Sequence, residues 1–232
     1  MRVVLEEVTL RRGAFRLGAS GTFSGGVHLV TGPVGSGKST LALALAGGLC
    51  PSEGRILREG IGSLTLGLPL PEYHVTGGTL GEEAASWGVD PGPVLAAAGL
   101  SGRAGEDPLR CSQGELKRLV LSSLLAREWD LLVLDEPYSS LDCAGKAALS
   151  ERLGERRRGI TILLTHEDEF LPRVDEIWEI RDGRLLSLGR VPEAIRRWSR
   201  PPRYLRAALE RGAEPENITP ADAREAVCRT RG

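Results

Sequence analysis

The chain has no apolar run long enough to cross a membrane as a helix. Such a helix needs about 20 consecutive apolar residues, and every apolar run in this sequence is much shorter. The N-terminus also lacks a charged segment followed by an apolar one, so we expect no signal peptide. Any association with a membrane must therefore come through a partner protein.

Cysteine, lysine and net charge are also scarce. The cysteines form no C-x-x-C pair and no zinc-binding spacing, which predicts reduced thiols in a cytosolic protein. They are Cys50, Cys111, Cys143 and Cys228. Lysine occurs only at positions 38, 117 and 146; we attribute the preference for arginine to genomic bias and assign a function only to Lys38. With a net charge of −1, the chain has no overall field that would attract nucleic acid.

What is present is ordinary for a soluble globular protein. The chain has 232 residues, of which 41% are hydrophobic and 26% charged. This length suits one large α/β domain, or a core with a small appendage. Strands that alternate with helices along the sequence predict a parallel α/β core.

The expected elements follow from apolar spacing and turn residues. Residues 2–31 predict short strands and turns in an antiparallel layer, and residues 54–66 predict a strand pair joined through Gly60. Apolar runs predict buried strands at 131–134 and 160–164, and Asp182-Gly183 predicts a closing hairpin. Helices are predicted at 40–46, 79–87 with a Thr79/Glu82 capping box, 93–98, 112–127, 144–157, 203–210 and 220–228.

One glycine-rich segment fits the phosphate-loop pattern G-x-x-x-x-G-K-[ST]. It consists of Gly32, Pro33, Val34, Gly35, Ser36, Gly37, Lys38, Ser39 and Thr40. A predicted strand precedes it and a predicted helix follows, so backbone N–H groups and the helix dipole would bind phosphate. Lys38 would reach the β- and γ-phosphates, and the Ser39 hydroxyl would hold Mg²⁺. A chance glycine-rich turn is the alternative, and the flanking elements argue against it.

Two acids follow the buried strand at 131–134. In a parallel sheet, ligands bind beyond the carboxyl ends of the strands, so Asp135 and Glu136 would emerge beside the phosphate loop. Asp135 suits Mg²⁺ through water, and Glu136 suits the attacking water as base or orienter. His166 ends the strand at 160–164 and could contact the γ-phosphate and that water. A solvated turn and an ordinary strand end are the alternatives for these positions.

Together with these motifs, three more residue groups resemble the ATP-binding-cassette (ABC) ATPases. Cys111-Ser112-Gln113-Gly114-Glu115 stands where that family has its signature, usually Leu-Ser-Gly-Gly-Gln, and Arg118 follows as usual. Ser139-Ser140-Leu141-Asp142 is similar to the family's D-loop, and His166 matches its switch histidine. The resemblance extends through almost the whole chain and implies a P-loop NTPase fold, with a RecA-like parallel core, an antiparallel β subdomain and a helical subdomain.

The resemblance implies a mechanism and partners. Two cassettes would meet head to tail, as a homodimer or heterodimer, with Mg²⁺ and ATP between the phosphate loop of one and the signature of the other. Ser112, Gln113, Gly114 and Glu115 would thus act on the partner's nucleotide. A transmembrane permease subunit would hold the protein at the cytoplasmic face of the membrane, and no nucleic acid is expected. The helical subdomain, at about 67–118, would carry the motion.

Within that family, three segments are similar to the energy-coupling-factor importer ATPases, which serve vitamins and transition-metal ions. They are 71–83, 182–193 and the tail at 201–222. The tail follows the break at Arg200-Pro201-Pro202, which predicts an ABC domain at 1–198 and a helical extension at 199–232. That extension is either a packing appendage or a dimer contact.

The sequence departs from the family at three places. The family's glutamine after the second strand pair is missing, because the only glutamine of the chain is Gln113. Leu66 stands about where it belongs, with Gly67 and Pro69 as alternatives, and no such side chain can ligate a metal. Slower hydrolysis is expected, or a water molecule in place of the amide. The signature is altered by Cys111 and Gln113. Finally, Arg12, Phe15 or neither would stack on adenine.

These departures leave alternative functions open. The chain could be a weak or regulatory cassette in an asymmetric heterodimer. A soluble cassette acting on DNA or ribosomes is disfavoured, because the chain has neither coiled coils nor a basic stripe. A phosphate-loop kinase would leave the signature, the D-loop and His166 unexplained.

Overall fold

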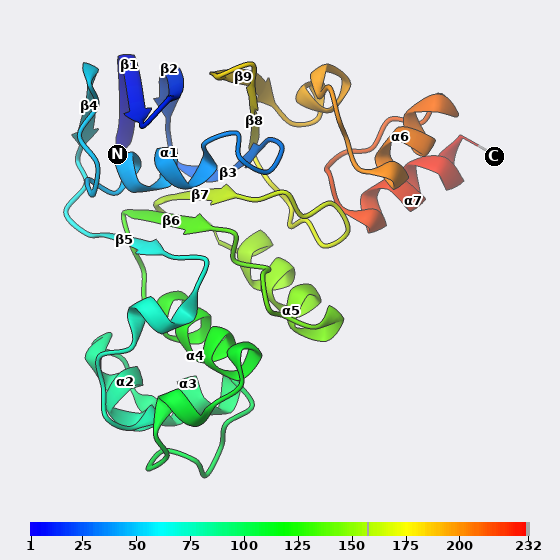
Figure 1. Ribbon diagram of the computed structural model, residues 1–232. Coiled ribbons are helices and arrows are strands. Elements are labelled where there is room, and N and C mark those ends of the chain that lie inside the picture. The colour runs from blue at the N-terminus through cyan, green and yellow to red at the C-terminus, as the bar shows by residue number, and fades with distance from the viewer. Residues whose placement is uncertain (157, 231–232) are drawn as a thin grey trace.

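Within the described residues, 1–156 and 158–230, the computed structural model contains one nine-stranded sheet in the order β4-β1-β2-β9-β8-β3-β7-β6-β5 (Figure 1). The strands are β1 (Arg2–Arg12), β2 (Phe15–Phe23), β3 (Gly26–Thr31), β4 (Glu53–Glu59), β5 (Leu64–Gly67), β6 (Leu131–Asp135), β7 (Ile160–Leu164), β8 (Glu176–Arg181) and β9 (Arg184–Arg190). Strands β8, β3, β7, β6 and β5 pair in parallel. The predicted parallel α/β core is confirmed.

Helices cover this core and fill the long connections. They are α1 (Lys38–Leu45), α2 (Leu80–Ser86), α3 (Pro91–Ala97), α4 (Gln113–Leu125), α5 (Cys143–Gly154), α6 (Arg203–Glu210) and α7 (Pro220–Arg229). Three 3-10 turns add η1 (Pro71–His74), η2 (Pro108–Arg110) and η3 (Glu193–Arg197). Among the described residues, no helix is both long and apolar enough to span a bilayer.

The core strands are buried on both faces, as their uninterrupted apolar runs predict. Every residue of β6 and β7 is buried. Because successive side chains of a strand point to opposite faces, Leu131 and Val133 pack in the cluster that includes α1. Leu132 and Leu134 pack in the cluster that includes residues of α4 and α5. Strand β6, which carries Asp135, is therefore packed on both faces.

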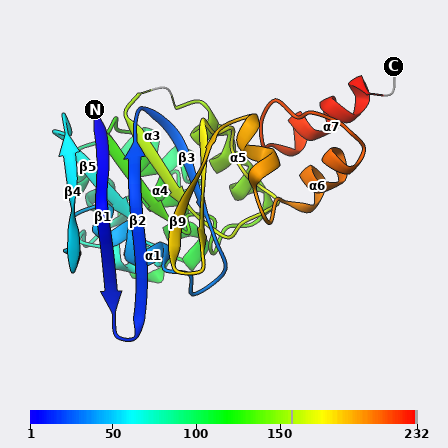
Figure 2. The same cartoon turned by 90° about the horizontal axis from the view of Figure 1, so that it is seen from above.

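The β1–β2 region is longer and more regular than predicted. Strands β1 and β2 form an antiparallel pair along nearly their whole length, with a register shift between Leu5 and Val8 (Figure 2). Glu7 lies in this irregularity with a φ of 46°. The bulge interrupts the alternation of apolar residues, which explains why the sequence favours short strands here.

The predicted strand pair at 54–66 is wrong. Strand β4 pairs with β1 at one edge of the sheet, whereas β5 pairs with β6 at the opposite edge. The connection does not turn back at Gly60, because the carboxylate of Asp130 accepts hydrogen bonds from the Gly62 and Ser63 amides, both at 2.8 Å. These contacts align β5 with the start of β6, a long-range effect that local turn signals do not contain.

The helix and hairpin predictions fare better. Strands β8 and β9 form the predicted antiparallel hairpin, with Asp182 and Gly183 at φ of 51° and 69°. Thr79 caps α2 by accepting the Glu82 amide at 3.2 Å. The return half of the predicted capping box is displaced, since Glu82 accepts from the amide of Gly78. Helix α5 ends at Gly154, and the predicted end at Arg157 lies outside the described residues.

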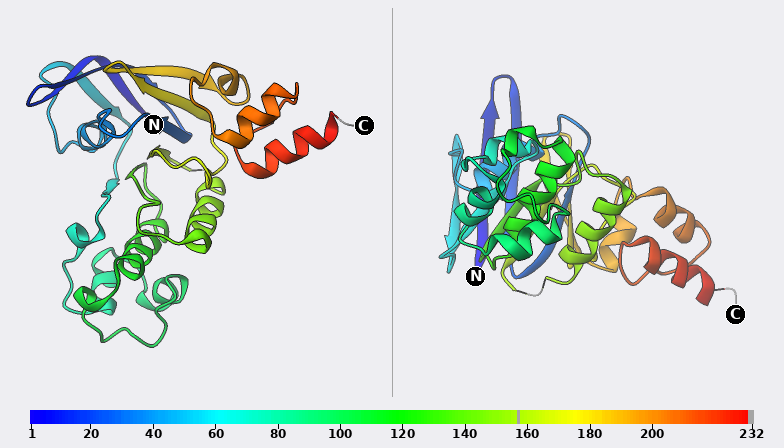
Figure 3. Two further views of the ribbon diagram at one scale, coloured as in Figure 1. Left: turned by 45° about the vertical axis from the view of Figure 1, so that its right-hand side comes forward. Right: turned by 90° about the horizontal axis from the view of Figure 1, so that it is seen from below.

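The last two helices stand at one side of the sheet, away from α2, α3 and α4 (Figure 3). Leu205, Ala208, Ile218 and Ala223 join the apolar cluster of the core. Asn217 is 9% exposed, and its side-chain amide pairs with both the N–H and the carbonyl of Val174, at 3.0 and 2.9 Å. The tail is thus fastened to the chain between β7 and β8.

Candidate functional site

The phosphate loop connects β3 to α1, as its sequence predicts. Gly37 precedes α1 with a φ of 100°, a conformation that favours glycine. A Cβ atom on Gly37 would lie 2.3 Å from Cζ of Phe15. Phe15, on β2, therefore packs directly against the loop. The positive φ and this contact each limit position 37 to glycine.

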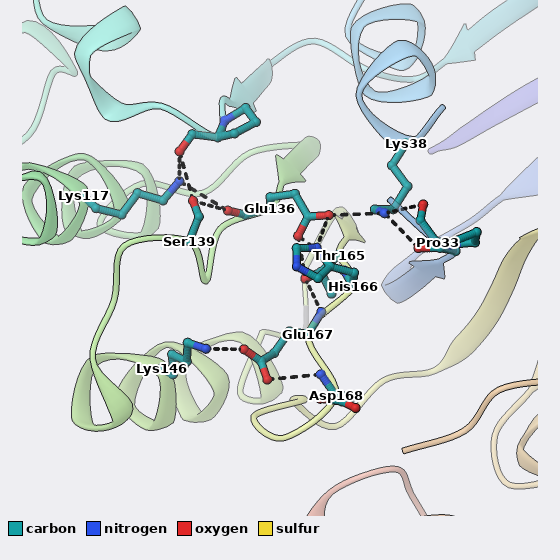
Figure 4. A network of polar contacts seen from close by, with 12 residues as sticks. Pro33, Lys38, Lys117, Glu136, Ser139, Lys146, Thr165, His166, Glu167 and Asp168 are labelled. Atoms are coloured by element: carbon teal, nitrogen blue, oxygen red, sulfur yellow. Dashed lines mark hydrogen bonds and ion pairs between the residues drawn. The ribbon is translucent and has the colours of Figure 1, made fainter. Parts of the chain in front are cut away.

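Lys38 is buried and turns back over the loop. Its ammonium donates hydrogen bonds to the carbonyls of Gly32 at 2.9 Å and Pro33 at 3.3 Å. It also lies 3.3 Å from Oε1 of Glu136. Lys38 thus places a positive charge at the mouth of the loop, between the loop backbone and the acid that follows β6 (Figure 4).

Asp135 and Ser39 form a donor pair that suits a hard cation. Asp135 is 1% exposed, and its Oδ1 has no hydrogen-bond partner among the described residues. Burial raises the pKa of Asp135, although a hydrogen bond with Ser39 and the charges of Lys38 and Lys117 oppose the shift. An unpartnered buried carboxylate oxygen beside a hydroxyl fits Mg²⁺, which prefers oxygen ligands. No group of three or more His, Cys, Asp or Glu in 1–156 and 158–230 could hold a metal.

Glu136 is the centre of the polar network. Its φ of 46° is uncommon for a residue with a side chain, and its amide donates to the carbonyl of Leu164 at 2.8 Å. The Oε2 atom accepts from the Thr165 hydroxyl at 3.0 Å and from the His166 amide at 3.3 Å. The carboxylate is therefore aimed by groups that lie at or just beyond the end of β7.

His166 completes this network on the solvent side. Its Nδ1 lies 2.8 Å from Oε1 of Glu136, and its side chain is 59% exposed. The imidazole therefore has one nitrogen engaged by the acid, while most of the ring remains accessible. The structure brings the predicted acid and the predicted histidine into direct contact.

These groups line one pocket of about 490 Å³. The lining residues are Arg12, Phe15, Val34, Gly35, Gly37, Lys38, Ser39, Thr40, Pro69, Glu136 and His166. Both candidates for contact with adenine, Arg12 and Phe15, are among them. The remaining predicted loop residues, Gly32, Pro33 and Ser36, are not among the lining residues; the Ser36 amide donates to the carbonyl of Pro33 at 3.1 Å.

Pro69 occupies the place in the pocket for which Leu66 was the first expectation. Leu66 instead packs against the core cluster around β1 and α1, and Gly67 ends strand β5 in a buried position. Strand β5 ends at Gly67, one residue beyond the predicted end at Leu66, and Pro69 is the one of the three alternatives that lines the pocket. A proline ring offers no polar atom there.

The predicted signature residues lie at the start of α4, outside the lining of this pocket. Ser112 caps the helix and forms a complete capping box with Glu115. The hydrogen bond from the Ser112 amide, and next the pairing with Arg103, lower the pKa of the Glu115 carboxyl to about 2. The Gln113 amide donates to Glu72 at 3.1 Å. A Cβ on Gly114 would lie 2.9 Å from the carbonyl of Ser140.

Asp142, predicted as a D-loop residue, is the N-cap of α5. Its carboxylate accepts the amide of Gly145 at 2.8 Å. This hydrogen bond accounts for an aspartate at the position by local helix physics alone. Contacts of Asp142 across a dimer stay a prediction.

Sequence reasoning missed Lys117, on α4. It is 1% exposed, and its ammonium lies among the carbonyls of Leu68, Pro69 and Glu136. Burial lowers its pKa to about 8, against the opposing charges of Asp135, Glu136 and Glu72. The available signal was that Val120 and Leu121, the next-turn neighbours of this lysine on the helix, are apolar.

Known proteins with similar sequences are transporter subunits. No family model matches the chain. An energy-coupling factor transporter ATP-binding protein of Thermotoga maritima is 35% identical over 199 residues, which cover 75% of each chain. A zinc import ATP-binding protein of Rhizobium etli is 34% identical over 226 residues, or 91% of this chain and 70% of that protein.

Solved structures show the same fold. An ATP-binding subunit of an ABC transporter superposes with a TM-score of 0.70 over 85% of this chain and 92% of that one, at 22% sequence identity. At this identity the likeness shows the fold alone.

Proposed function

The chain belongs to the ATP-binding subunits of ABC transporters, which are ATPases, and from this premise we propose that it powers a membrane importer. Its cargo would be a vitamin or a transition-metal ion, as its likeness to an energy-coupling-factor subunit and a zinc import subunit suggests. Subunits of this kind generally dimerise and pair with transmembrane components. We place it at the cytoplasmic face of the membrane, held by a permease.

One observation carries the proposal most strongly: the carboxylate of Glu136 contacts Lys38 and His166, which line one pocket with it, and accepts a hydrogen bond from Thr165. Its Oε2 atom accepts hydrogen bonds from two groups that follow β7, and its Oε1 atom contacts Lys38 and His166. A carboxylate held in this way orients a water molecule and accepts its proton. Lys38 supplies the positive charge that phosphate oxygens need.

The other pocket residues have proposed roles that follow from their positions. Gly32–Thr40 would bind the phosphates, and Ser39 with Asp135 would hold Mg²⁺, which when bound neutralises phosphate charge. Arg12 ends β1 and Phe15 begins β2, so both flank the turn of this hairpin, where they would contact the adenine base. His166 would lie between Glu136 and the γ-phosphate, where it would form a hydrogen bond or transfer a proton.

A second subunit would complete this pocket. We propose that the α4 N-terminus, with Ser112, Gln113, Gly114 and Glu115, acts on the nucleotide of a partner cassette, with Asp142 near the same contact. The N-terminus of α4 is suited to phosphate because its amides are directed outward. The segment at 67–118 would transmit closure to the permease, as part of an ATPase domain at 1–198 followed by the extension at 199–232.

An asymmetric heterodimer is the second candidate. The side chain of Gln113, in the signature, donates a hydrogen bond to Glu72. Pro69 lines the pocket at a place where the family usually has a glutamine. The altered signature would weaken the site that it completes in the partner, whereas Pro69 belongs to the pocket of this chain's own phosphate loop. A tight, active homodimer formed by this chain alone would contradict the asymmetric arrangement.

The proposed function is tested by measuring Mg²⁺-dependent ATP hydrolysis by the chain and by its Glu136→Gln variant. We expect the variant to lose hydrolysis by about 100-fold or more and to keep ATP binding, with an ATP-bound dimer accumulating. Unchanged turnover in Glu136→Gln would contradict the assignment of the base. Co-purification from membranes would identify the permease partner, and the absence of any membrane protein would contradict the transport role.

A further inference from the structure

Lys117 carries a buried charge that no proposed catalytic step uses. Lysine is almost never fully buried unless it is paired, and this one is 1% exposed. Its three N–H donors have three carbonyl acceptors: Leu68 at 3.1 Å, Pro69 at 2.7 Å and Glu136 at 3.4 Å. All of its hydrogen-bonding capacity is therefore spent on backbone groups from two separate segments (Figure 4).

Ser139 shares two of these acceptors. Its hydroxyl lies 3.1 Å from the carbonyl of Pro69 and 2.9 Å from that of Glu136. A hydroxyl has a single hydrogen to donate, and the Ser139 amide also donates to the Glu136 carbonyl, at 3.2 Å. Lys117 is the donor that reaches these two carbonyls and that of Leu68 from helix α4, and it thereby ties the loop after β5 and the turn after β6 to that helix.

Both segments contribute residues to the lining of the pocket. The ring of Pro69 lines the pocket directly, and the carboxylate of Glu136 meets Lys38 and His166 within it. Leu68 is held on its other side as well, because its amide donates to Nε2 of His74 at 2.9 Å. The backbone of this loop is therefore fixed although its pocket side chain is a proline.

Given the proposed ATPase function, we infer that Lys117 is a positioning residue for hydrolysis, which fixes Glu136 and the Pro69 loop relative to helix α4 through their backbone carbonyls. The same helix begins at the signature residue Ser112. Lys117 is thus the direct link between the element that would face the partner's nucleotide and the base that acts on the chain's own nucleotide.

A purely structural role and a positioning role have different kinetic consequences. The contacts of Lys117 are with the Pro69 loop and Glu136, whereas the contacts of Lys38 are with the phosphate loop. Loss of Lys117 should therefore reduce kcat and leave ATP affinity nearly unchanged, because misplacing a catalytic group by about 1 Å can cost up to 100-fold in rate. A purely structural residue would lower stability without this separation.

The test compares Lys117→Met with the matched variant Arg118→Met in the full chain. Arg118 is the next residue of α4 and donates to the carbonyl of Ala98 at 2.9 Å, so its loss also removes a side-chain-to-backbone hydrogen bond from the helix. We expect Lys117→Met to lower kcat about tenfold or more, with the Kd for ATP changed less than about threefold. Arg118→Met should lower the unfolding midpoint and keep kcat within about threefold.

Hydrogen–deuterium exchange of the peptide at 67–76 gives a readout that does not need activity. We expect faster exchange there in Lys117→Met and no change in Arg118→Met. If Lys117→Met does not fold, Ser139→Ala should show the same direction of change in kcat and exchange, to a smaller extent. Unchanged kcat in Lys117→Met, equal kcat losses in both methionine variants, or unchanged exchange would overturn the inference. A wild-type chain without ATPase activity would contradict the proposed function instead. Hydrogen–deuterium exchange of the peptide at 67–76 would still test whether Lys117 holds that loop.

Discussion

Nδ1 of His166 lies 2.8 Å from Oε1 of Glu136, although the two residues follow different strands, β7 and β6. The parallel pairing of these strands, with Asp135 opposite Leu164, brings their ends together at one edge of the sheet. The contact fixes one ring nitrogen and leaves the rest of the imidazole at the pocket.

Replacing His166 with alanine should reduce ATP hydrolysis by on the order of 100-fold, because a positioned proton-transfer group contributes about that much to rate. ATP affinity should change little, since the phosphate loop is untouched. Steady-state hydrolysis and equilibrium nucleotide binding measure the two effects. Arg158→Ala, which removes an exposed ion pair with Glu128, is a control that should behave as wild type. Full activity in His166→Ala would remove His166 from the proposed mechanism.

Pro69→Gln should raise hydrolysis by roughly three- to tenfold, because an amide can contact a metal ion or water and a proline ring cannot. The backbone carbonyl that Lys117 holds is retained in this variant. Pro69→Ala is the matched control, since it also removes the ring but adds no amide. Equal rates for the glutamine and alanine variants would show that an amide at this position has no catalytic value here.

Gly37→Ala should weaken ATP binding at least about tenfold and destabilise the fold by about 1–3 kcal/mol. Its Cβ would lie 2.3 Å from Phe15, and its φ of 100° disfavours any side chain. Gly35→Ala separates the two effects, because Gly35 also has a positive φ but nothing lies within 4 Å of its Cβ position. If both variants lose binding equally, strain rather than the Phe15 contact explains the glycine at position 37.

The stability of the fold should depend on pH through His74. Burial, and next the charge of Lys117, lower the pKa of His74 below its usual 6.5, and its Nε2 must be unprotonated to accept the Leu68 amide. The unfolded chain therefore binds more protons near pH 6.5 than the folded chain. Stability from this group is present above pH 6.5 and is lost as pH falls below it, by at most about 1.4 kcal/mol per pH unit.

Denaturant unfolding of wild type and His74→Gln between pH 5 and 8 measures this effect. The difference in unfolding free energy between the two proteins should shrink as the pH falls. A difference that is constant over this range would show that His74 titrates alike in the folded and unfolded chains.

Asn217→Ala should destabilise the protein by about 1–3 kcal/mol, because it leaves the buried N–H and carbonyl of Val174 without their partner. In a chain of this size that corresponds to a fall in melting temperature of roughly 2–4 °C per kcal/mol. Thermal unfolding measures it, with the exposed Glu214→Ala as the control. An unchanged melting temperature would mean that the tail is not fastened to the core through Asn217.

The sequence predicted those parts of the fold and the pocket that depend on local patterns. The phosphate loop, the buried strands that carry Asp135 and His166, and the hairpin at Asp182-Gly183 all follow from short-range spacing. The β4–β5 pair was wrong because Asp130 and β6, far along the chain, decide where β5 pairs. Lys117 was missed because its acceptors are backbone carbonyls, which leave no mark in a sequence.

The order of the strands predicts different thermal stability for the two sides of the pocket. The phosphate loop leaves β3, which has neighbours on both sides, and Glu136 and His166 leave β6 and β7, which are also interior. Pro69 follows β5, a strand of four residues at the rim of the sheet. Edge segments fray before interior ones. On warming, the phosphate loop, Glu136 and His166 should therefore stay ordered at temperatures at which the segment around Pro69 has lost its structure. ATP binding should then survive to temperatures at which ATP hydrolysis has already ceased.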